Sequence, residues 1–165
     1  MRAVRRFAFA AAILLLAACG SGHDARGTIE QAQAGLGRVR SGTVRVHVTV
    51  HAPIPVERSA TLRAEQLPLS ELHLTRWTKH PRRLDCARGL ECARADLDVE
   101  AVRRDLDPLL PTLPVDPESI RSTRVDVAVA GDGQPRWIRL HGGLDSGGMM
   151  PGSVPFDVDV ELKAS

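Results

Sequence analysis

The sequence is poor in aromatic residues and has no strong excess of one charge. Of its 165 residues, 22 are Lys or Arg, 20 are Asp or Glu, and none is tyrosine. Beyond residue 18 the aromatic residues are Trp77, Trp137 and Phe156. Residues 1–18 contain three arginines, so the rest of the chain has 19 basic and 20 acidic side chains, a net charge of −1. Nucleic-acid-binding domains carry basic stripes or stacking aromatic residues. We therefore expect no nucleic-acid partner.

The sequence also lacks an apolar run long enough to cross a membrane. The run over residues 7–18 has 12 residues, whereas a transmembrane helix needs roughly 18–20. Arginines precede this run, and Leu-Ala-Ala-Cys at residues 16–19 ends it. A basic start, a short apolar stretch and small residues before a cleavage point are typical of a secretory signal peptide.

The tetrapeptide at residues 16–19 resembles the lipobox of bacterial lipoproteins. The resemblance implies that the thiol of Cys19 receives a diacylglyceryl group, that cleavage occurs just before it, and that the new amino terminus is acylated. Two or more acyl chains make a stable membrane anchor, whereas one chain does not. We expect residues 1–18 to be a signal peptide and residues 19–27, small and polar after the cysteine, to be a tether. Residues 28–165 are then a single domain anchored to a cell membrane on its extracytoplasmic face.

The other two cysteines are expected to form a disulfide. Cys86 and Cys92 are separated by five residues, whereas redox sites typically have the spacing Cys-x-x-Cys. A metal site would need further ligands, and only His80 and Asp85 lie nearby in the sequence. An oxidising compartment permits the disulfide. We therefore favour the disulfide over a metal site and expect neither a metal nor a cofactor.

No catalytic frame is present in the sequence, which lacks both Gly-x-Ser-x-Gly and His-Glu-x-x-His. His47 and His51 would lie about 13 Å apart on a strand, too far for one ion. Asp157, Asp159 and Glu161 share one predicted strand face. Three such carboxylates suit a cation or the hydrolysis of a glycosidic bond, but an ordinary solvated face is the simpler interpretation. We expect no catalytic residue and a protein that is not an enzyme.

The periodicity of apolar residues predicts an α+β domain. Spacings of three and four residues predict helices over residues 28–39 and 99–110. Alternation of apolar and polar residues predicts six strands, over residues 43–51, 56–67, 72–77, 125–129, 136–141 and 156–163. Residues 131–133, Gly-Asp-Gly, are predicted to form a hairpin turn. Strands with one apolar face favour a curved antiparallel sheet, and we expect the two helices to cover it.

This order of elements after a lipobox resembles the half-barrel lipoproteins of the LppX/LprG type and the LolA/LolB carriers, whose curved sheets hold acyl chains under helices. The resemblance covers most of residues 26–163 and rests on element order and strand texture. It implies a non-enzymatic envelope lipoprotein that binds a lipid or another apolar ligand. The residues expected to line the cavity are apolar and alternate along the predicted strands: Val44, Val46, Val48, Leu62, Leu74, Ile138, Phe156 and Val158. In a domain without a cavity, the same residues would form a solid core.

The alternative hypothesis is an interaction module that docks an envelope protein and holds no internal ligand. An amphipathic aromatic residue precedes a basic cluster, and the long loop over residues 142–155 carries two adjacent methionines. Basic residues near an anionic membrane contribute about 1 kcal/mol each, and methionine adapts to varied contacts. A cavity below about 300 Å³ would favour docking. The expected membrane or partner contacts are Trp77, Lys79, Arg82, Arg83, Met149 and Met150.

Overall fold

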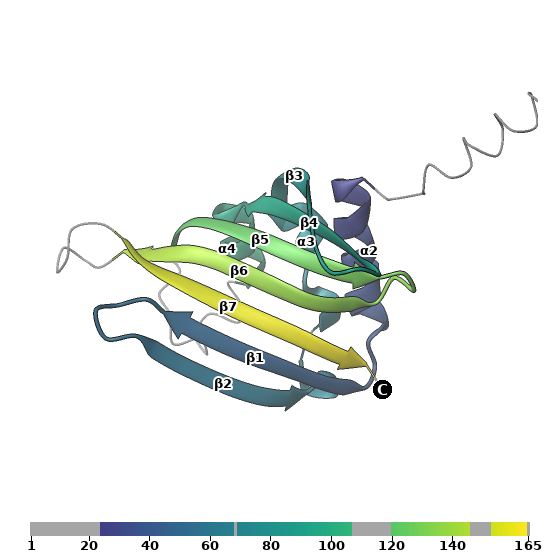
Figure 1. The fold of residues 1–165 in the computed structure, drawn as a ribbon, viewed down its shortest axis with the longest axis horizontal. Helices are drawn as coiled ribbons and strands as arrows, with labels where there is room; N and C mark the ends of the chain where they lie inside the picture. The colour runs from purple at the N-terminus through teal and green to yellow at the C-terminus, as the bar shows by residue number, and fades with distance from the viewer. Residues whose placement is uncertain (1–23, 68, 107–119, 146–152, 165) are drawn as a thin grey trace, which may run out of the picture.

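A single open sheet of antiparallel strands forms the body of the protein (Figure 1). The computed structural model describes residues 24–67, 69–106, 120–145 and 153–164. Within these residues the sheet has seven strands in the order β2-β1-β7-β6-β5-β4-β3. The predicted antiparallel sheet with helices is confirmed, but the prediction of six strands is wrong by one.

The described residues form seven strands, three α-helices and two 3₁₀ helices. The strands are β1 (Gly42–Val50), β2 (Val56–Arg63), β3 (Thr78–Leu84), β4 (Leu90–Leu97), β5 (Ile120–Ala130), β6 (Pro135–Asp145) and β7 (Ser153–Ala164). The α-helices are α2 (Ala25–Arg38), α3 (Leu74–Trp77) and α4 (Val99–Leu106), and two short 3₁₀ helices are η1 (Ala64–Gln66) and η2 (Leu69–Glu71). Helix α2 begins three residues earlier than predicted because the Asp24 carboxylate accepts a hydrogen bond from the Gly27 amide at 2.6 Å and caps it.

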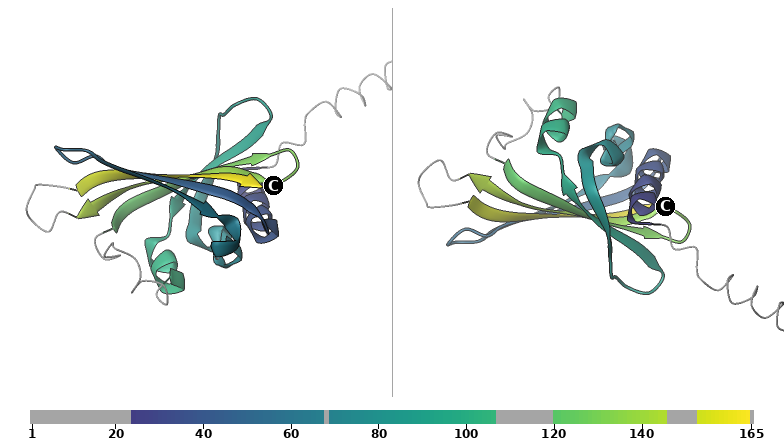
Figure 2. Two further views of the ribbon diagram at one scale, coloured as in Figure 1. Left: turned by 90° about the horizontal axis from the view of Figure 1, so that it is seen from below. Right: turned by 90° about the horizontal axis from the view of Figure 1, so that it is seen from above.

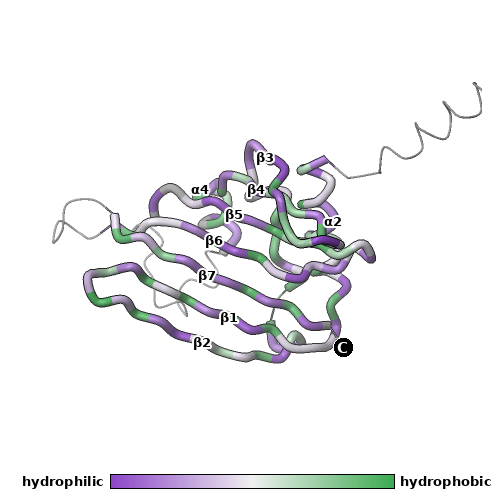
Figure 3. The backbone as a smooth tube through the Cα atoms, in the orientation of Figure 1, coloured by the Kyte–Doolittle hydropathy of each residue, from purple (hydrophilic) through white to green (hydrophobic). Residues whose placement is uncertain are grey.

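The strands with unbroken alternation form where the sequence predicts them. Val44 pairs with Leu162 and Val48 with Val158, so β1 and β7 lie side by side with their valines on one face. Figure 3 shows hydrophobic and hydrophilic residues alternating along both strands. The predicted turn between β5 and β6 is also confirmed, with the Gly133 amide donating to the Ala130 carbonyl at 2.8 Å.

The prediction of a strand over residues 72–77 is wrong, because Leu74–Trp77 form helix α3. Leu74 and Trp77 are three residues apart, and one helical turn buries both side chains in the core. The next two strands, β3 and β4, were not predicted. β3 contains Pro81, and a proline is tolerated there because β3 lies at the edge of the sheet. β4 has alanines at its inward positions, and alanine is a weak strand former.

The helices of the described residues lie on one face of the sheet, as Figure 2 shows from above and below. Because β2 and β3 are the two edge strands, the chain between them crosses this face as η1, η2 and α3. Helix α2 packs beside this crossing segment and against β4 and β5. The buried residues at this contact are Ile29, Ala32, Leu36, Leu74, Ala93, Ala95, Val125, Val127 and Val129.

The predicted disulfide lies at the turn of the β3–β4 hairpin. Cys86 and Cys92 are bonded, with their Cα atoms 6.1 Å apart. Cys92 lies in β4 and is buried, whereas Cys86 lies in the exposed connection between the strands. The bond therefore closes a short loop at one edge of the sheet.

Candidate functional site

The helices cover only part of the apolar sheet face. Val44 and Ile138 are buried in the core, and the partly buried Val46 packs against the same core cluster. Farther along the same strands, Val48 and Val158 are only partly buried. The apolar face therefore extends beyond the described helices, toward the end of the sheet where β1 and β6 finish and β7 begins (Figure 1).

A cavity of about 840 Å³ lies at this end of the sheet. Its wall takes residues from both faces of the sheet and from the start of α4. The apolar face contributes Leu97, Thr123, Gly142 and Phe156, α4 contributes Val99, and the polar face and adjoining chain contribute Arg82, Asp96, Arg124, His141, Gly143, Ser153, Pro155 and Asp157. Four pairs of consecutive residues in the wall have one residue on each face of the sheet: 96–97, 123–124, 141–142 and 156–157.

Local sequence explains why the space is there. β4 ends at Leu97 and the chain turns into α4, so the first residues of β5 have no β4 partner. β6 has Gly142 and Gly143 at this level, and the space beside them is taken by the ring of Phe156 and by the side chain of Ser153. A Cβ atom at Gly142 would lie 2.7 Å from the ring of Phe156. The glycine therefore lets the Phe156 ring lie directly over the backbone of β6.

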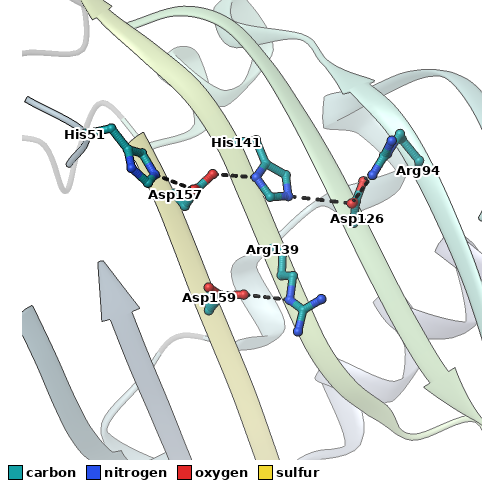
Figure 4. Close-up of polar contacts among 7 residues, drawn as sticks. All are labelled: His51, Arg94, Asp126, Arg139, His141, Asp157 and Asp159. Atoms are coloured by element: carbon teal, nitrogen blue, oxygen red, sulfur yellow. Dashed lines mark hydrogen bonds and ion pairs between the residues drawn. The ribbon is translucent and has the colours of Figure 1, made fainter. Parts of the chain in front are cut away.

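The polar sheet face carries a chain of hydrogen-bonded and charged side chains beside the cavity (Figure 4). His51 Nε2 lies 2.7 Å from Asp157 Oδ2, and the other oxygen of Asp157 lies 2.5 Å from His141 Nδ1. His141 Nε2 faces Asp126 Oδ2 at 3.6 Å. Asp126 accepts two hydrogen bonds from Arg94, both 2.7 Å long. These contacts thus link β7, β6, β5 and β4 and end on a bidentate Arg–carboxylate pair.

The environment of these contacts keeps Asp126 and Asp157 ionised. Burial would raise the pKa of the Asp126 carboxyl, which is 3% exposed, but the hydrogen bonds and charge of Arg94 outweigh it and lower the pKa below its ordinary value. The charges of His141 and Arg124 act in the same direction. Burial also opposes ionisation of Asp157, and hydrogen bonds from His51 and His141 lower its pKa below the ordinary value.

The arrangement differs from a serine-hydrolase triad, although Ser153, His141 and Asp157 all line the cavity. In a triad, one imidazole nitrogen faces a carboxylate and the other faces the serine hydroxyl. Here both nitrogens of His141 face carboxylates. The geometry is that of a charge-paired polar surface.

The chain matches no family model, and no curated protein sequence matches it significantly.

The predicted ligand-binding residues separate into a core group and a group near the open end. Val44, Leu74 and Ile138 are buried, while Val46, Val48, Val158 and Phe156 are partly buried. Leu62, on edge strand β2, is 36% exposed. Of the eight residues, Phe156 is the one in the wall of the large cavity.

The predicted contact residues do not form one surface. Trp77 is 6% exposed, and its indole N–H donates to Asp105 at 2.8 Å, so its ring belongs to the core. Lys79, Arg82 and Arg83 are exposed on edge strand β3. Lys79 forms an ion pair with Asp98 at 2.6 Å. The remaining predicted residues, Cys19, Met149 and Met150, lie outside the described residues.

The three carboxylates predicted on one face of β7 are each paired with a basic group. Asp157 contacts two histidines, Asp159 lies 2.6 Å from Arg139, and Glu161 lies 3.7 Å from Arg45. His47 Nδ1 lies 2.6 Å from the Ser59 hydroxyl, whereas His51 contacts Asp157. These pairings fit the interpretation of a solvated sheet face.

Sequence reasoning missed Arg124, Asp126 and the role of His141. Asp126 lies between valines in the alternating stretch 125–129, which marks it as a polar-face residue, and this was the available signal. Its partner Arg94 lies on a strand that the pattern did not predict.

Among the described residues, no helix is long and apolar enough to span a membrane.

Proposed function

We propose that this protein is a membrane-anchored lipoprotein of the cell envelope that binds a lipid or another apolar ligand in the cavity at the open end of its sheet. The observation that carries the proposal is the size of this cavity together with the apolar part of its wall. Its volume of about 840 Å³ falls within the 300–1,000 Å³ typical of small-molecule sites.

The surroundings of the cavity support an apolar ligand. Leu97, Val99 and Phe156 line it, and the partly buried Val48 and Val158 continue the same apolar sheet face. Burial of an apolar chain on such a surface contributes about 25 cal/mol for each Å² removed from water. An acyl chain on this part of the wall therefore gains binding free energy from apolar burial.

The resemblance to half-barrel lipoproteins supports the same proposal. An open antiparallel sheet with helices on one face is the arrangement through which those proteins hold acyl chains. The lipobox at residues 16–19 is the basis for anchoring the domain through Cys19. The rival proposal, docking of an envelope protein, depended partly on an exposed Trp77, and that side chain is buried.

Native mass spectrometry of the full chain tests the proposal. The protein is expressed in a bacterial host, extracted from the membrane fraction in a mild detergent, and exposed to an extract of host lipids. We expect a stoichiometric adduct that passes into organic solvent and can be identified there. An apo mass under all these conditions would contradict the proposal.

A pair of tryptophan variants locates the ligand. Val99→Trp places a large ring in the cavity wall and is expected to reduce the occupancy of the adduct several-fold. Ile54→Trp makes a similar change at a residue that is 80% exposed in the connection between β1 and β2 and is not in the cavity wall, and it is expected to leave the occupancy unchanged. Equal occupancy in the two variants would place the ligand elsewhere and contradict the assignment to this cavity.

A further inference from the structure

The cavity wall combines apolar and cationic groups in a way that selects among apolar ligands. Consecutive residues of a strand point to opposite faces of the sheet. Phe156 and Asp157 are consecutive, as are Thr123 and Arg124, and all four line the same cavity. The cavity wall therefore includes residues of the apolar face and residues of the charged face.

Most charged groups near the cavity already have partners. Arg94 is held by Asp126 through two hydrogen bonds of 2.7 Å. Asp157 contacts His51 and His141. Arg82 lies 3.5 Å from Asp96, which also contacts a histidine. These groups neutralise one another and leave little net charge for a ligand.

Arg124 differs from them. It lies on β5 in register with Asp96 on β4 and His141 on β6, in the middle of the polar part of the wall. It is exposed, and within the described part of the chain it forms no ion pair shorter than 4 Å. A guanidinium offers five N–H donors in a planar fork that matches carboxylate and phosphate groups. Arg124 is thus a cation available to a ligand.

We propose that the cavity binds an anionic amphiphile, with the anionic headgroup on Arg124 and the acyl chain against Leu97, Val99 and Phe156. This inference rests on the proposed function and names the class of ligand. The shared chemistry is a carboxylate or phosphate attached to an acyl chain, as in a fatty acid or an anionic phospholipid.

Matched pairs of lipids test the inference. Native mass spectrometry compares oleate with oleyl alcohol, and phosphatidylglycerol with diacylglycerol, each titrated into the full chain in detergent. We expect the anionic member of at least one pair to bind about tenfold more tightly or better, as for a hydrogen bond to a charged group. The pair that discriminates identifies the headgroup as carboxylate or phosphate.

Two arginine variants assign the preference to one side chain. Arg124→Gln is expected to bind the anionic and neutral members of each pair equally, while binding of the neutral lipid stays as in the wild type. Arg136→Gln is the control, since Arg136 is also exposed on the sheet but lies at the β5–β6 turn, outside the cavity wall. It is expected to keep the preference.

The outcomes separate the inference from the proposed function. If neutral and anionic lipids bind the wild type equally, or if Arg124→Gln keeps the preference, the inference is overturned and apolar-ligand binding remains supported. If neither member of either pair binds, the proposed function fails as well. Retained binding of the neutral lipid by Arg124→Gln shows that this variant is folded.

Discussion

Gly35 lies where helix α2 comes closest to the β5–β6 turn. A Cβ atom at this position would lie 2.6 Å from the Gly133 carbonyl oxygen and even closer to the ring of Pro135. The clash involves backbone and a rigid ring, neither of which can move aside easily. The close approach of helix and turn therefore depends on the absence of a side chain at residue 35.

We predict that Gly35→Ala destabilises the fold by about 1–3 kcal/mol, the usual cost of overpacking. Gly37→Ala is the matched control in the same helix, because nothing lies within 4 Å of its added Cβ. Alanine favours helix over glycine, so this variant gains about 0.5–1 kcal/mol. Urea unfolding measures both changes. A stabilised Gly35→Ala would show that the helix can move away from the turn.

Asp126 is the most buried charge of the polar network and should make the fold sensitive to acid. Its pKa is lowered in the folded protein, so the unfolded chain takes up a proton at a higher pH than the folded one does. The stability that it contributes is fully present above the unfolded pKa of about 3.9. That stability is lost as the pH falls through the lower folded pKa.

We predict that Asp126→Asn unfolds more easily at pH 6, by about 1–3 kcal/mol, because Arg94 loses its charged partner at a buried position. The variant should also lose less stability than the wild type between pH 4 and pH 2. Asp159→Asn breaks an exposed pair on the same face, which costs at most about 1 kcal/mol. Urea midpoints across this pH range measure the effect, and parallel curves for wild type and Asp126→Asn would contradict it.

At the scale of elements, the β3–β4 hairpin combines an exposed, irregular edge strand with a disulfide. β3 lies at an edge, contains Pro81 and has an irregular register between Lys79 and Arg82. Its side chains are mostly exposed, so it buries little apolar area. The covalent link between Cys86 and Cys92 limits the freedom of this loop in the unfolded chain.

Replacing both cysteines, Cys86→Ala with Cys92→Ala, is predicted to lower the free energy of unfolding by about 2–3 kcal/mol in the chain-entropy model. A reductant should destabilise the wild type by a similar amount and leave the double variant unchanged. Thermal unfolding with and without reductant makes this comparison. A double variant as stable as the oxidised wild type would show that β3 is held by its neighbours alone.

The elements that the sequence predicts are those whose pattern agrees with their environment. β1 alternates valine with polar residues because one face meets the core and the other meets water. β4 has Ala93 and Ala95 on its inward face, where α2 packs closely, and small residues give no clear strand signal. Residues 72–77 carry leucines at alternate positions, but the spacing of Leu74 and Trp77 also suits a helix. The helix forms because one helical turn buries both of these side chains in the core.

The candidate site follows the same physical logic. Phe156 could be chosen from the sequence because it is a large apolar residue on an amphipathic strand. Arg124 could not, since its importance comes from the register that places Asp96, Arg124, His141 and Asp157 in one row across four strands. Strand register depends on tertiary pairing, and a shift of one residue would move each side chain to the other face.

At the scale of the whole molecule, the start of the described chain lies on the β3–β4 side of the sheet. Helix α2 begins at Ala25 beside β3, where Arg26 and Ile29 line a small pocket with Thr78 and Pro81 (Figure 1). Thr78 pairs with Leu97, which also lines the large cavity. The start of α2 and the β4 side of the cavity are therefore neighbours in the fold.

Attachment through Cys19 makes a prediction that does not depend on the cavity. When bacteria expressing the full chain are fed labelled palmitate, the wild type should incorporate the label and partition into the detergent phase, because its lipid chains anchor it. Cys19→Ser removes the thiol that would accept the lipid, so it should incorporate none and retain the mass of residues 1–18. Cys86→Ala with Cys92→Ala is the control, since it removes two thiols and should leave labelling unchanged. Loss of residues 1–18 without labelling of the wild type would identify an ordinary secretory signal and contradict lipid anchoring.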